Sequence, residues 1–210
     1  MSTRFIVIRH GETHWNRQGR IQGHLDSALT EEGMEQAEAV AERLAKQNVD
    51  VLYSSDLGRA RQTARRIAER CGLDILTDRR LREKNLGAFQ GLTATDMKAR
   101  FPLEYARYLS REPSFVIPGG ESARQFFDRT VSCFEDLASR ASGGTVVVVT
   151  HGGVLGCLYR HVARMPLDAA RDFSLLNASF NAFRYDSGTW TKEVWGDVSH
   201  LTRENTLDEL

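Results

Sequence analysis

Two short apolar segments, one near each end of the chain, each run directly into a histidine that is followed by glycine. The first is Phe5–Ile8, which continues as Arg9-His10-Gly11-Glu12. The second is Val146–Val149, which continues as Thr150-His151-Gly152-Gly153. Continuous apolar runs of this length are typical of strands buried on both faces of a parallel sheet. Ligands bind beyond the carboxyl ends of such strands, so one site assembled from both ends of the chain is expected.

Strand and helix signals alternate along most of the 210 residues. Strands are expected over 5–8, 49–53, 74–77 and 146–149, with a closing hairpin of 180–185 and 190–195. Helices are expected after Thr30, after Ser54-Ser55-Asp56, after Ser122 and over 154–162. The pattern predicts one α/β domain over residues 1–210, with an open, mostly parallel central sheet and helices on both faces.

Apolar side chains recur at helical spacing inside two of these segments. The helix after Thr30 is expected to bury a stripe of Met34, Ala37, Val40, Ala41 and Leu44. The helix after Ser122 is expected to turn Phe127, Val131, Phe134 and Leu137 inward. Each stripe predicts a helix that packs against the sheet.

Residues 86–120 differ from the rest of the chain. They hold three of the four prolines, a Gly-Gly pair and several aromatic residues. We interpret them as a largely helical insertion that covers the site as a lid, because long excursions in small domains are often functional. A surface insertion without a role is the alternative.

The balance of charges limits the class of partner. Lys plus Arg (28) equals Asp plus Glu (28), which gives a net charge of zero. Proteins that bind nucleic acid or membrane surfaces usually carry a basic excess, so neither partner is expected. Any anion-binding site must therefore be local.

The three cysteines are too far apart in sequence for a CxxC pair or a zinc site. Reduced thiols are the better interpretation, and with no signal peptide evident after Met1 they indicate a cytoplasmic protein. The longest apolar runs are too short to span a bilayer. The acidic tail after Arg203 is expected to be frayed, and a homodimer remains open.

His10 is the first candidate for chemistry. A neutral imidazole can attack phosphorus when its other nitrogen is held as N–H, and Gly11 lets the backbone approach closely. Arg9 adds a permanent charge whose forked donors match a phosphate group. A lone histidine is more often structural, but its place at a strand end between a cation and a glycine favours the functional reading.

Arg59 is expected in the first turn of a helix, where the helix dipole disfavours a cation. A bound anion would explain it, since helix N-termini bind anions. The alternative is a solvated basic face that Arg59 shares with Arg61, Arg65 and Arg66. Glu83 stands among charged neighbours, and its spacing alone indicates nothing beyond an exposed acid.

These segments together resemble the histidine phosphatase superfamily, also called the phosphoglycerate mutase-like family. The matching motifs, in family order, are Arg9-His10-Gly11-Glu12-Thr13 with Trp15-Asn16, Arg20-Ile21-Gln22-Gly23 with Asp26 and Leu29-Thr30, Tyr53-Ser54-Ser55 with Arg59-Ala60 and Thr63-Ala64, Leu81-Arg82-Glu83 with Gly87 and Gly91, Pro118-Gly119-Gly120-Glu121-Ser122, and Thr150-His151-Gly152-Gly153. They cover residues 4 to about 200.

The resemblance implies a role for each matched residue. His10 resembles the nucleophile that becomes phosphohistidine, and Glu83 resembles the proton donor to the leaving group. Arg9, Arg59 and His151 are similar to the residues that hold the phosphoryl oxygens. The remaining phosphate contacts implied are Asn16, Gln22, Gly23 and Gly152. No metal or cofactor is implied, because guanidinium groups can stabilise the transferred charge.

Length and the short insertion resemble the smaller phosphatases of the family, whose substrates include α-ribazole phosphate and phosphoserine, more than the longer glycolytic mutases. We therefore expect a metal-independent phosphatase of small phosphorylated metabolites. A phosphoglycerate mutase is the alternative within the family. Outside it, the alternatives are a metallohydrolase, which a chelator would inactivate, and a phospho-ligand sensor without activity, which a chromogenic phosphatase assay would identify.

Overall fold

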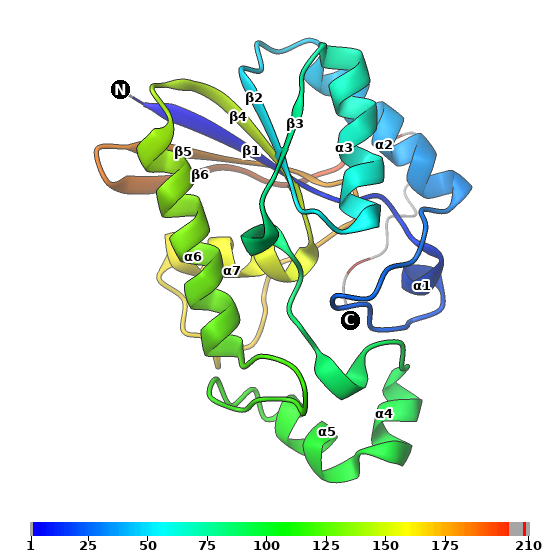
Figure 1. The fold of residues 1–210 in the computed structure, drawn as a ribbon. Coiled ribbons are helices and arrows are strands. Elements are labelled where there is room, and N and C mark those ends of the chain that lie inside the picture. Colours follow the sequence, from blue (N-terminus) through cyan, green and yellow to red (C-terminus); the bar gives the residue numbers. More distant parts are fainter. Residues whose placement is uncertain (1, 202–207, 209–210) are drawn as a thin grey trace.

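The computed structural model describes residues 2–201 and residue 208, which form helical layers around a central sheet (Figure 1). Its strands are β1 (Thr3–Arg9), β2 (Val51–Ser54), β3 (Ile75–Thr77), β4 (Gly144–Thr150), β5 (Phe180–Asp186) and β6 (Thr189–Asp197). Their order across the sheet is β3-β2-β4-β1-β5-β6. The first four are parallel to one another, and β5 and β6 are antiparallel to their neighbours. The predicted open, mostly parallel sheet is confirmed.

Alternate side chains of the central strands pack on opposite faces of the sheet, as the twofold repeat of a strand requires. Phe5 and Val7 of β1 belong to one core cluster, with α6 (Ala123–Arg140) and α7 (Gly152–Ala163). Ile6 and Ile8 belong to another, with α2 (Glu31–Leu44) and α3 (Gly58–Cys71). The prediction of helices on both faces is confirmed.

Local capping signals explain where several helices begin. Thr30 accepts a hydrogen bond from the Gly33 N–H at 3.0 Å and caps α2. Ser122 and Gln125 form a capping box at the start of α6, and Gly72 ends α3 in the left-handed conformation. The helix starts at Thr30 and Ser122 are those that the sequence predicted.

Three details of the prediction need correction. The strand expected at 49–53 begins at Val51, and Met34 of the stripe expected in α2 is only half-buried. The predicted inward stripe of α6 is also partly wrong. The buried residues of α6 are Phe126, Thr130, Cys133, Phe134, Leu137 and Ala138. Phe127 and Val131 are only half-buried, and Phe127 packs instead on His161 of α7. Because two phenylalanines are adjacent, the sequence pattern does not tell which of them faces the core. The packing of α6 on α7 buries Phe126.

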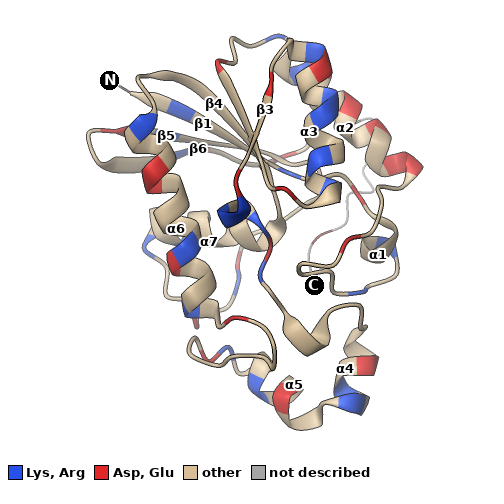
Figure 2. Cartoon of the chain, viewed as in Figure 1, with Lys and Arg blue, Asp and Glu red and all other residues tan. Residues whose placement is uncertain are grey.

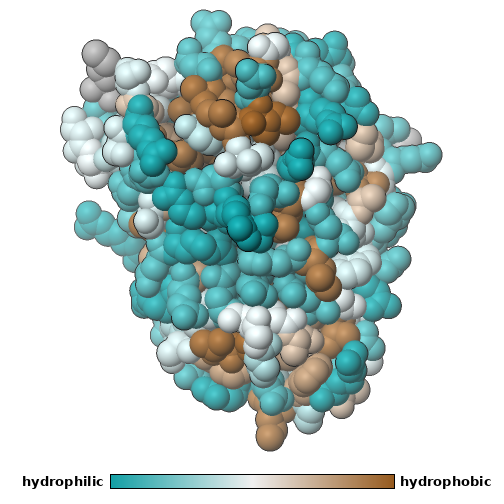
Figure 3. Space-filling model, viewed as in Figure 1, coloured by the Kyte–Doolittle hydropathy of each residue, from teal (hydrophilic) through white to brown (hydrophobic). Residues whose placement is uncertain are grey.

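The insertion at 86–120 forms a small third core of its own. It contains the 3-10 turn Gly87–Phe89 and the short helices α4 (Ala94–Arg100) and α5 (Pro102–Leu109), and it lies at the lower end of Figure 1. Phe89 is fully buried within this core. Apolar side chains also reach its surface, as the brown areas at the lower end of Figure 3 show. The movement of this segment as a lid stays a prediction.

The remaining expectations concern smaller features. Cys133 and Cys157 are buried, Cys71 is half-buried, and all three are free thiols. Burial raises the pKa of Cys133 and of Cys157 to about 12. Within residues 2–201 no helix is long and apolar enough to cross a membrane. The tail predicted to be frayed lies, apart from Asp208, outside the described residues.

Candidate active site

The two strand-end histidines meet because β1 and β4 are neighbours in register. Arg9 pairs with Thr150, so His10 and His151 are the next residues at the same edge of the sheet. Their ring centroids lie 5.3 Å apart, and the ring planes are inclined by 62°. The backbone N–H of His10 donates to the Thr150 carbonyl at 3.0 Å. Residues separated by most of the chain are thus fixed beside each other by backbone hydrogen bonds.

The surroundings of His10 fix both its tautomer and its charge. Nδ1 lies 2.7 Å from the carbonyl oxygen of Gly11, and because a carbonyl only accepts, Nδ1 carries the proton. Nε2 accepts a hydrogen bond from Nε of Arg59 at 3.2 Å. Burial, reinforced by the charges of Arg59 and Arg9, lowers the pKa of His10 well below its usual value. His10 is therefore a neutral imidazole whose lone pair lies on Nε2, the protonation state of a nucleophile.

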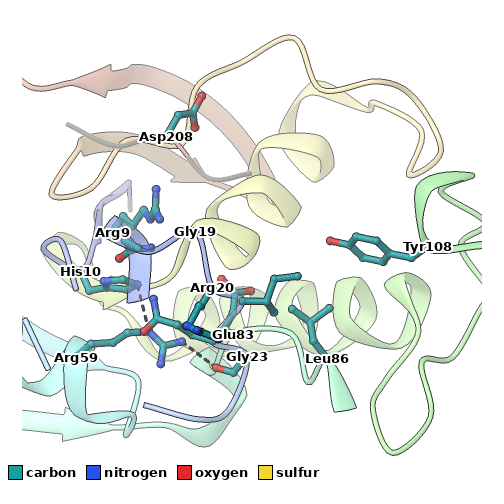
Figure 4. A pocket seen from close by; sticks show the side chains of 13 residues that line it. Arg9, His10, Gly19, Arg20, Gly23, Arg59, Glu83, Leu86, Tyr108 and Asp208 are labelled. Atoms are coloured by element: carbon teal, nitrogen blue, oxygen red, sulfur yellow. Dashed lines mark hydrogen bonds between the residues drawn. The ribbon is translucent and has the colours of Figure 1, made fainter. Parts of the chain in front are cut away.

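Arg59 is almost completely buried, with 1% of its surface exposed. Besides His10, its guanidinium donates to the Gly23 carbonyl at 2.8 Å and the Leu25 carbonyl at 2.9 Å. It also pairs with Asp26 at 3.1 Å. These contacts hold the guanidinium in place beside the nucleophile (Figure 4).

Asp26 also explains how a cation fits at the start of α3. Its carboxylate accepts hydrogen bonds from the backbone N–H groups of Gly58 and Arg59, so it caps the helix from another loop. The side chain of Leu57, which occupies the N-cap position, provides no such bond. The anion inferred from the placement of Arg59 is thus supplied at least in part by the protein itself. Local sequence gave no signal for a cap that lies 32 residues upstream.

Arg9 comes from the last residue of β1 and is 2% exposed. Its Nη1 donates to the carbonyl of Leu175. The adjacent Asn177 donates from Nδ2 to the His10 carbonyl at 3.0 Å. The segment that precedes β5 therefore supports the nucleophile and its neighbour from the far side of β1, which sequence reasoning did not identify.

A polar wall of the cavity is formed by Asn16 of α1 (His14–Arg17) and by Gln22 and Gly23 of the loop that follows. The amide oxygen of Asn16 accepts from Thr13, so its amide nitrogen remains to donate to a ligand. Gly23 has a φ of +55°, and a Cβ there would lie 2.3 Å from Oε1 of Gln90. At this φ a residue with a side chain would be strained, and its Cβ would force the Gln90 side chain to move.

Glu83 is the residue for which local sequence and structure differ most. Its neighbours indicate exposure, but it is only 6% exposed and lines the same cavity. Oε2 accepts from the Gly153 N–H at 2.9 Å, and Oε1 from the Lys84 N–H at 2.7 Å. A Cβ on Gly153 would lie 2.1 Å from Oε1 of Glu83, so the glycine after Gly152 makes room for the carboxyl group.

His151 and Gly152 do not line this cavity. His151 is fully buried against His10, and its Nε2 lies 2.8 Å from Oγ of Ser55. Burial, followed by the charges of Arg59, His10 and Arg9, lowers the pKa of His151 well below its usual value. Its contact with a phosphoryl group remains a prediction, as does that of Gly152. The sequence indicated Ser55 only as a potential cap.

The rest of the cavity wall includes Arg20, Leu86, Tyr108 and Asp208 (Figure 4). Arg20 belongs to a family motif, Leu86 flanks another, and Tyr108 is one of the aromatic residues of the predicted lid, whereas nothing marked Asp208. Asp208 is held at the cavity by the Leu175 N–H at 2.7 Å and by Arg171 at 3.2 Å. Arg9, His10 and Arg59 line one end of the cavity, the cationic end, and Figure 4 shows Asp208 on the same side as Arg9. Leu86 and Tyr108 line the other end, at the insertion.

Charges elsewhere balance between neighbouring helices. In Figure 2 α2 carries mostly Asp and Glu and α3 mostly Lys and Arg, and Arg70 of α3 pairs with Glu38 and Glu42 of α2 at 2.6 Å and 3.2 Å. Among the residues that the structure describes, no group of three or more His, Cys, Asp or Glu side chains is arranged to hold a metal ion.

Comparison with known proteins agrees with this geometry. Residues 5–198 match the profile of the histidine phosphatase superfamily, branch 1. Two Arabidopsis thaliana proteins are similar: phosphoglycerate mutase-like protein 4, 46% identical over 96% of this chain and 88% of its own, and metal-independent phosphoserine phosphatase, 41% identical over 95% and 84%. A mycobacterial glucosyl-3-phosphoglycerate phosphatase, solved with VO3, superposes with a TM-score of 0.80 at 36% identity over 92% of this chain and 98% of its own. The family expected from the motifs is confirmed: this chain belongs to the histidine phosphatase superfamily.

Proposed function

We propose that this protein hydrolyses small phosphomonoesters in two steps, through a phosphohistidine on Nε2 of His10. The observation that carries the proposal is the state of His10, a neutral ring with Nδ1–H fixed on Gly11 and Nε2 directed at a buried arginine in a cavity. An oxyanion that replaces the ring as the partner of Arg59 would arrive next to the nucleophilic lone pair.

Phosphate binding is assigned to the cationic end of the cavity. Arg9 and Arg59 would neutralise the non-bridging oxygens, and the free amide nitrogen of Asn16 would donate to one of them. Gln22 and Gly23 would border the group, and His151 and Gly152 would complete the site at the start of α7. Buried, pre-oriented donors of this kind stabilise the charge of a transferred phosphoryl group.

Glu83 is assigned to proton transfer. In the first step the bond from Nε2 to phosphorus forms, the bond to the ester oxygen breaks, and protonated Glu83 gives its proton to the departing alkoxide. In the second step Glu83 takes a proton from water as the water oxygen attacks phosphorus and the bond to Nε2 breaks. The products are an alcohol and phosphate, and both histidine and glutamic acid are regenerated.

The class of substrate is a small phosphorylated metabolite, with phosphate at His10 and the alcohol near Leu86 and Tyr108. Hydrolysis is favoured over a mutase reaction because named phosphatases are among the similar proteins. The mutase-like relative keeps transfer between two hydroxyl groups as the second candidate. Three free thiols suit a reducing cytoplasm, and a homodimer remains to be tested.

The test uses purified protein and a panel of phosphorylated metabolites, with both free phosphate and isomerised product measured. Wild-type protein mixed briefly with substrate should carry acid-labile phosphate, and His10→Ala should abolish turnover and labelling. EDTA should leave the rate unchanged, because cationic side chains do the work of a metal. Acid-stable label, or label that persists in His10→Ala, would falsify the assignment; isomerised product without free phosphate would establish a mutase.

A further inference from the structure

Glu83 is held not only by its carboxyl group but also through the backbone of the segment that carries it. This segment, Arg79–Lys84, begins as a 3-10 turn and lies between β3 and the insertion. Its backbone belongs to no strand of the sheet, so side chains must satisfy most of its carbonyl groups. Oγ1 of Thr150 in β4 donates to the Leu81 carbonyl at 2.8 Å. One side chain, Arg129 of α6, binds several of these carbonyl groups.

The guanidinium of Arg129 donates to three carbonyl groups of this segment. Nη1 binds the carbonyl oxygens of Arg80 at 2.7 Å and Arg82 at 3.0 Å, and Nη2 binds that of Glu83 at 3.3 Å. Nη2 also donates to Oε1 of Glu121 at 2.6 Å. Only a planar group with several rigidly spaced donors can make all these bonds at once.

Two further contacts extend this clamp in both directions. His24 lies next to Gly23 in the loop after α1, and its Nε2 is 2.9 Å from the same Glu83 carbonyl. Glu121 accepts from the Asn85 N–H at 2.8 Å, and its own N–H donates to the Asn85 carbonyl at 2.9 Å. The residues before and after the carboxyl-bearing side chain are therefore both fixed, by groups from the loop after α1 and from the end of the insertion.

We propose that Arg129 is a positioning residue for Glu83, which holds the backbone of residues 80–83 so that the carboxyl group meets the leaving oxygen. Glu121 acts as the counter-ion that keeps the guanidinium in place. This inference rests on the proposed function, since it requires Glu83 to be the proton donor. Arg129 itself does not line the cavity, so it acts through Glu83 and not on the substrate.

The test is Arg129→Met, which removes all the donors but keeps an unbranched chain against Phe126, whose ring lies 5.0 Å from the guanidinium. A displacement of the acid by about 1 Å can cost about 10²-fold, so hydrolysis of O-phosphoserine and glycerol phosphate should slow by roughly 10- to 100-fold. The burst of p-nitrophenol from p-nitrophenyl phosphate should change little, because that leaving group departs without a proton. Inhibition by vanadate should also be preserved.

Arg124→Met is the matched control. Arg124 also lies on α6, is exposed, and places its guanidinium 6.0 Å from the Phe127 ring, with no contact to residues 80–83. Its ratio of alkyl to aryl rates should equal that of the wild type. If Arg129→Met does not fold, Arg129→Lys replaces it, because one ammonium group can pair with Glu121 but cannot span three carbonyls.

The decisive comparison repeats the Arg129 substitution in a Glu83→Gln background. An effect that acts through Glu83 should disappear there, so that the double variant is no slower on alkyl phosphates than Glu83→Gln alone. The same fractional loss in both backgrounds, or equal losses of the first-step rate on alkyl and aryl substrates in rapid mixing, would overturn the positioning role. If Glu83→Gln alone does not slow alkyl phosphates, the assignment of the acid fails instead, which is a distinct result.

Discussion

The two ends of the cavity are built in different ways. At the cationic end His10, Arg59 and Glu83 are 3%, 1% and 6% exposed, and backbone carbonyl or N–H groups fix each of them. At the other end Tyr108 stands on α5, in a segment with its own small core and with Leu103 78% exposed. The side chains of the first end are each held in one position by hydrogen bonds. Side chains of the second end can be substituted without disturbing the sheet, because they belong to a separate core.

This contrast suggests a division of work. We propose that the end at the sheet edge provides the chemistry common to all substrates and that the end at the insertion selects among leaving groups. Substitutions at the first end should then lower every rate or depend only on the acidity of the leaving group. Substitutions at the second end should change the order of preference among substrates.

Glu83→Gln should give the largest effect among these tests. Alkyl phosphates should react roughly 10²- to 10⁴-fold more slowly, because a general acid typically contributes that much. p-Nitrophenyl phosphate should show a burst of nitrophenol and then slow turnover, since the second step lacks its base. Rapid-mixing kinetics on both substrates measure this. Equal loss on both without a burst would make Glu83 a positioning residue, and Glu12 would be the next candidate for the acid.

Arg59→Met should slow all substrates by roughly 10²- to 10³-fold, the usual cost of removing one donor to a developing oxyanion. Arg59→Lys should not restore the rate, because an ammonium group cannot reach Gly23, Leu25 and His10 together. Arg61→Met, at an exposed position on the same helix, is the control. Steady-state kinetics on alkyl and aryl phosphates should show a uniform loss; a loss confined to one substrate would contradict the shared role.

Tyr108→Ala tests the other end. The relative kcat/KM values for different alcohols should change by roughly 10-fold, at the low end of what one pocket contact contributes, while inhibition by vanadate stays constant. Leu103→Ala is the control, because it also lies on α5 but does not line the cavity. If the order of substrates is unchanged, selection does not occur at the insertion.

A smaller effect is expected in the pH dependence of stability. Burial lowers the pKa of His10 and His151 in the folded protein, so below about pH 6.5 the unfolded chain binds more protons than the folded one. Stability should therefore be lost as the pH falls below that value, by about 1.4 kcal/mol per pH unit for each such histidine. Urea unfolding at pH 7 and pH 5.5 should show a smaller difference for His10→Gln than for the wild type. An identical difference would mean that His10 takes up a proton in the folded state.

Much of the fold and part of the site followed from local signals. The valine-rich strand, the caps at Thr30 and Ser122, and the two histidines after apolar runs are each encoded within a few residues. The burial of Glu83 is not, because it depends on a hydrogen bond from Gly153, 70 residues away. The cap from Asp26 and the support from Leu175 and Asn177 are likewise long-range contacts, and they cannot be predicted from sequence spacing.

The position of β1 has a consequence for co-translational folding. Both partners of this first strand, β4 and β5, come from the last third of the sequence. A nascent chain therefore has to keep its most apolar N-terminal segment unpaired until nearly all of the polypeptide has been made, since pairing between distant segments is slow and exposes them to aggregation. Phosphatase activity would appear only when synthesis is almost complete. The time at which activity first appears would therefore report when β1 pairs with β4 and β5.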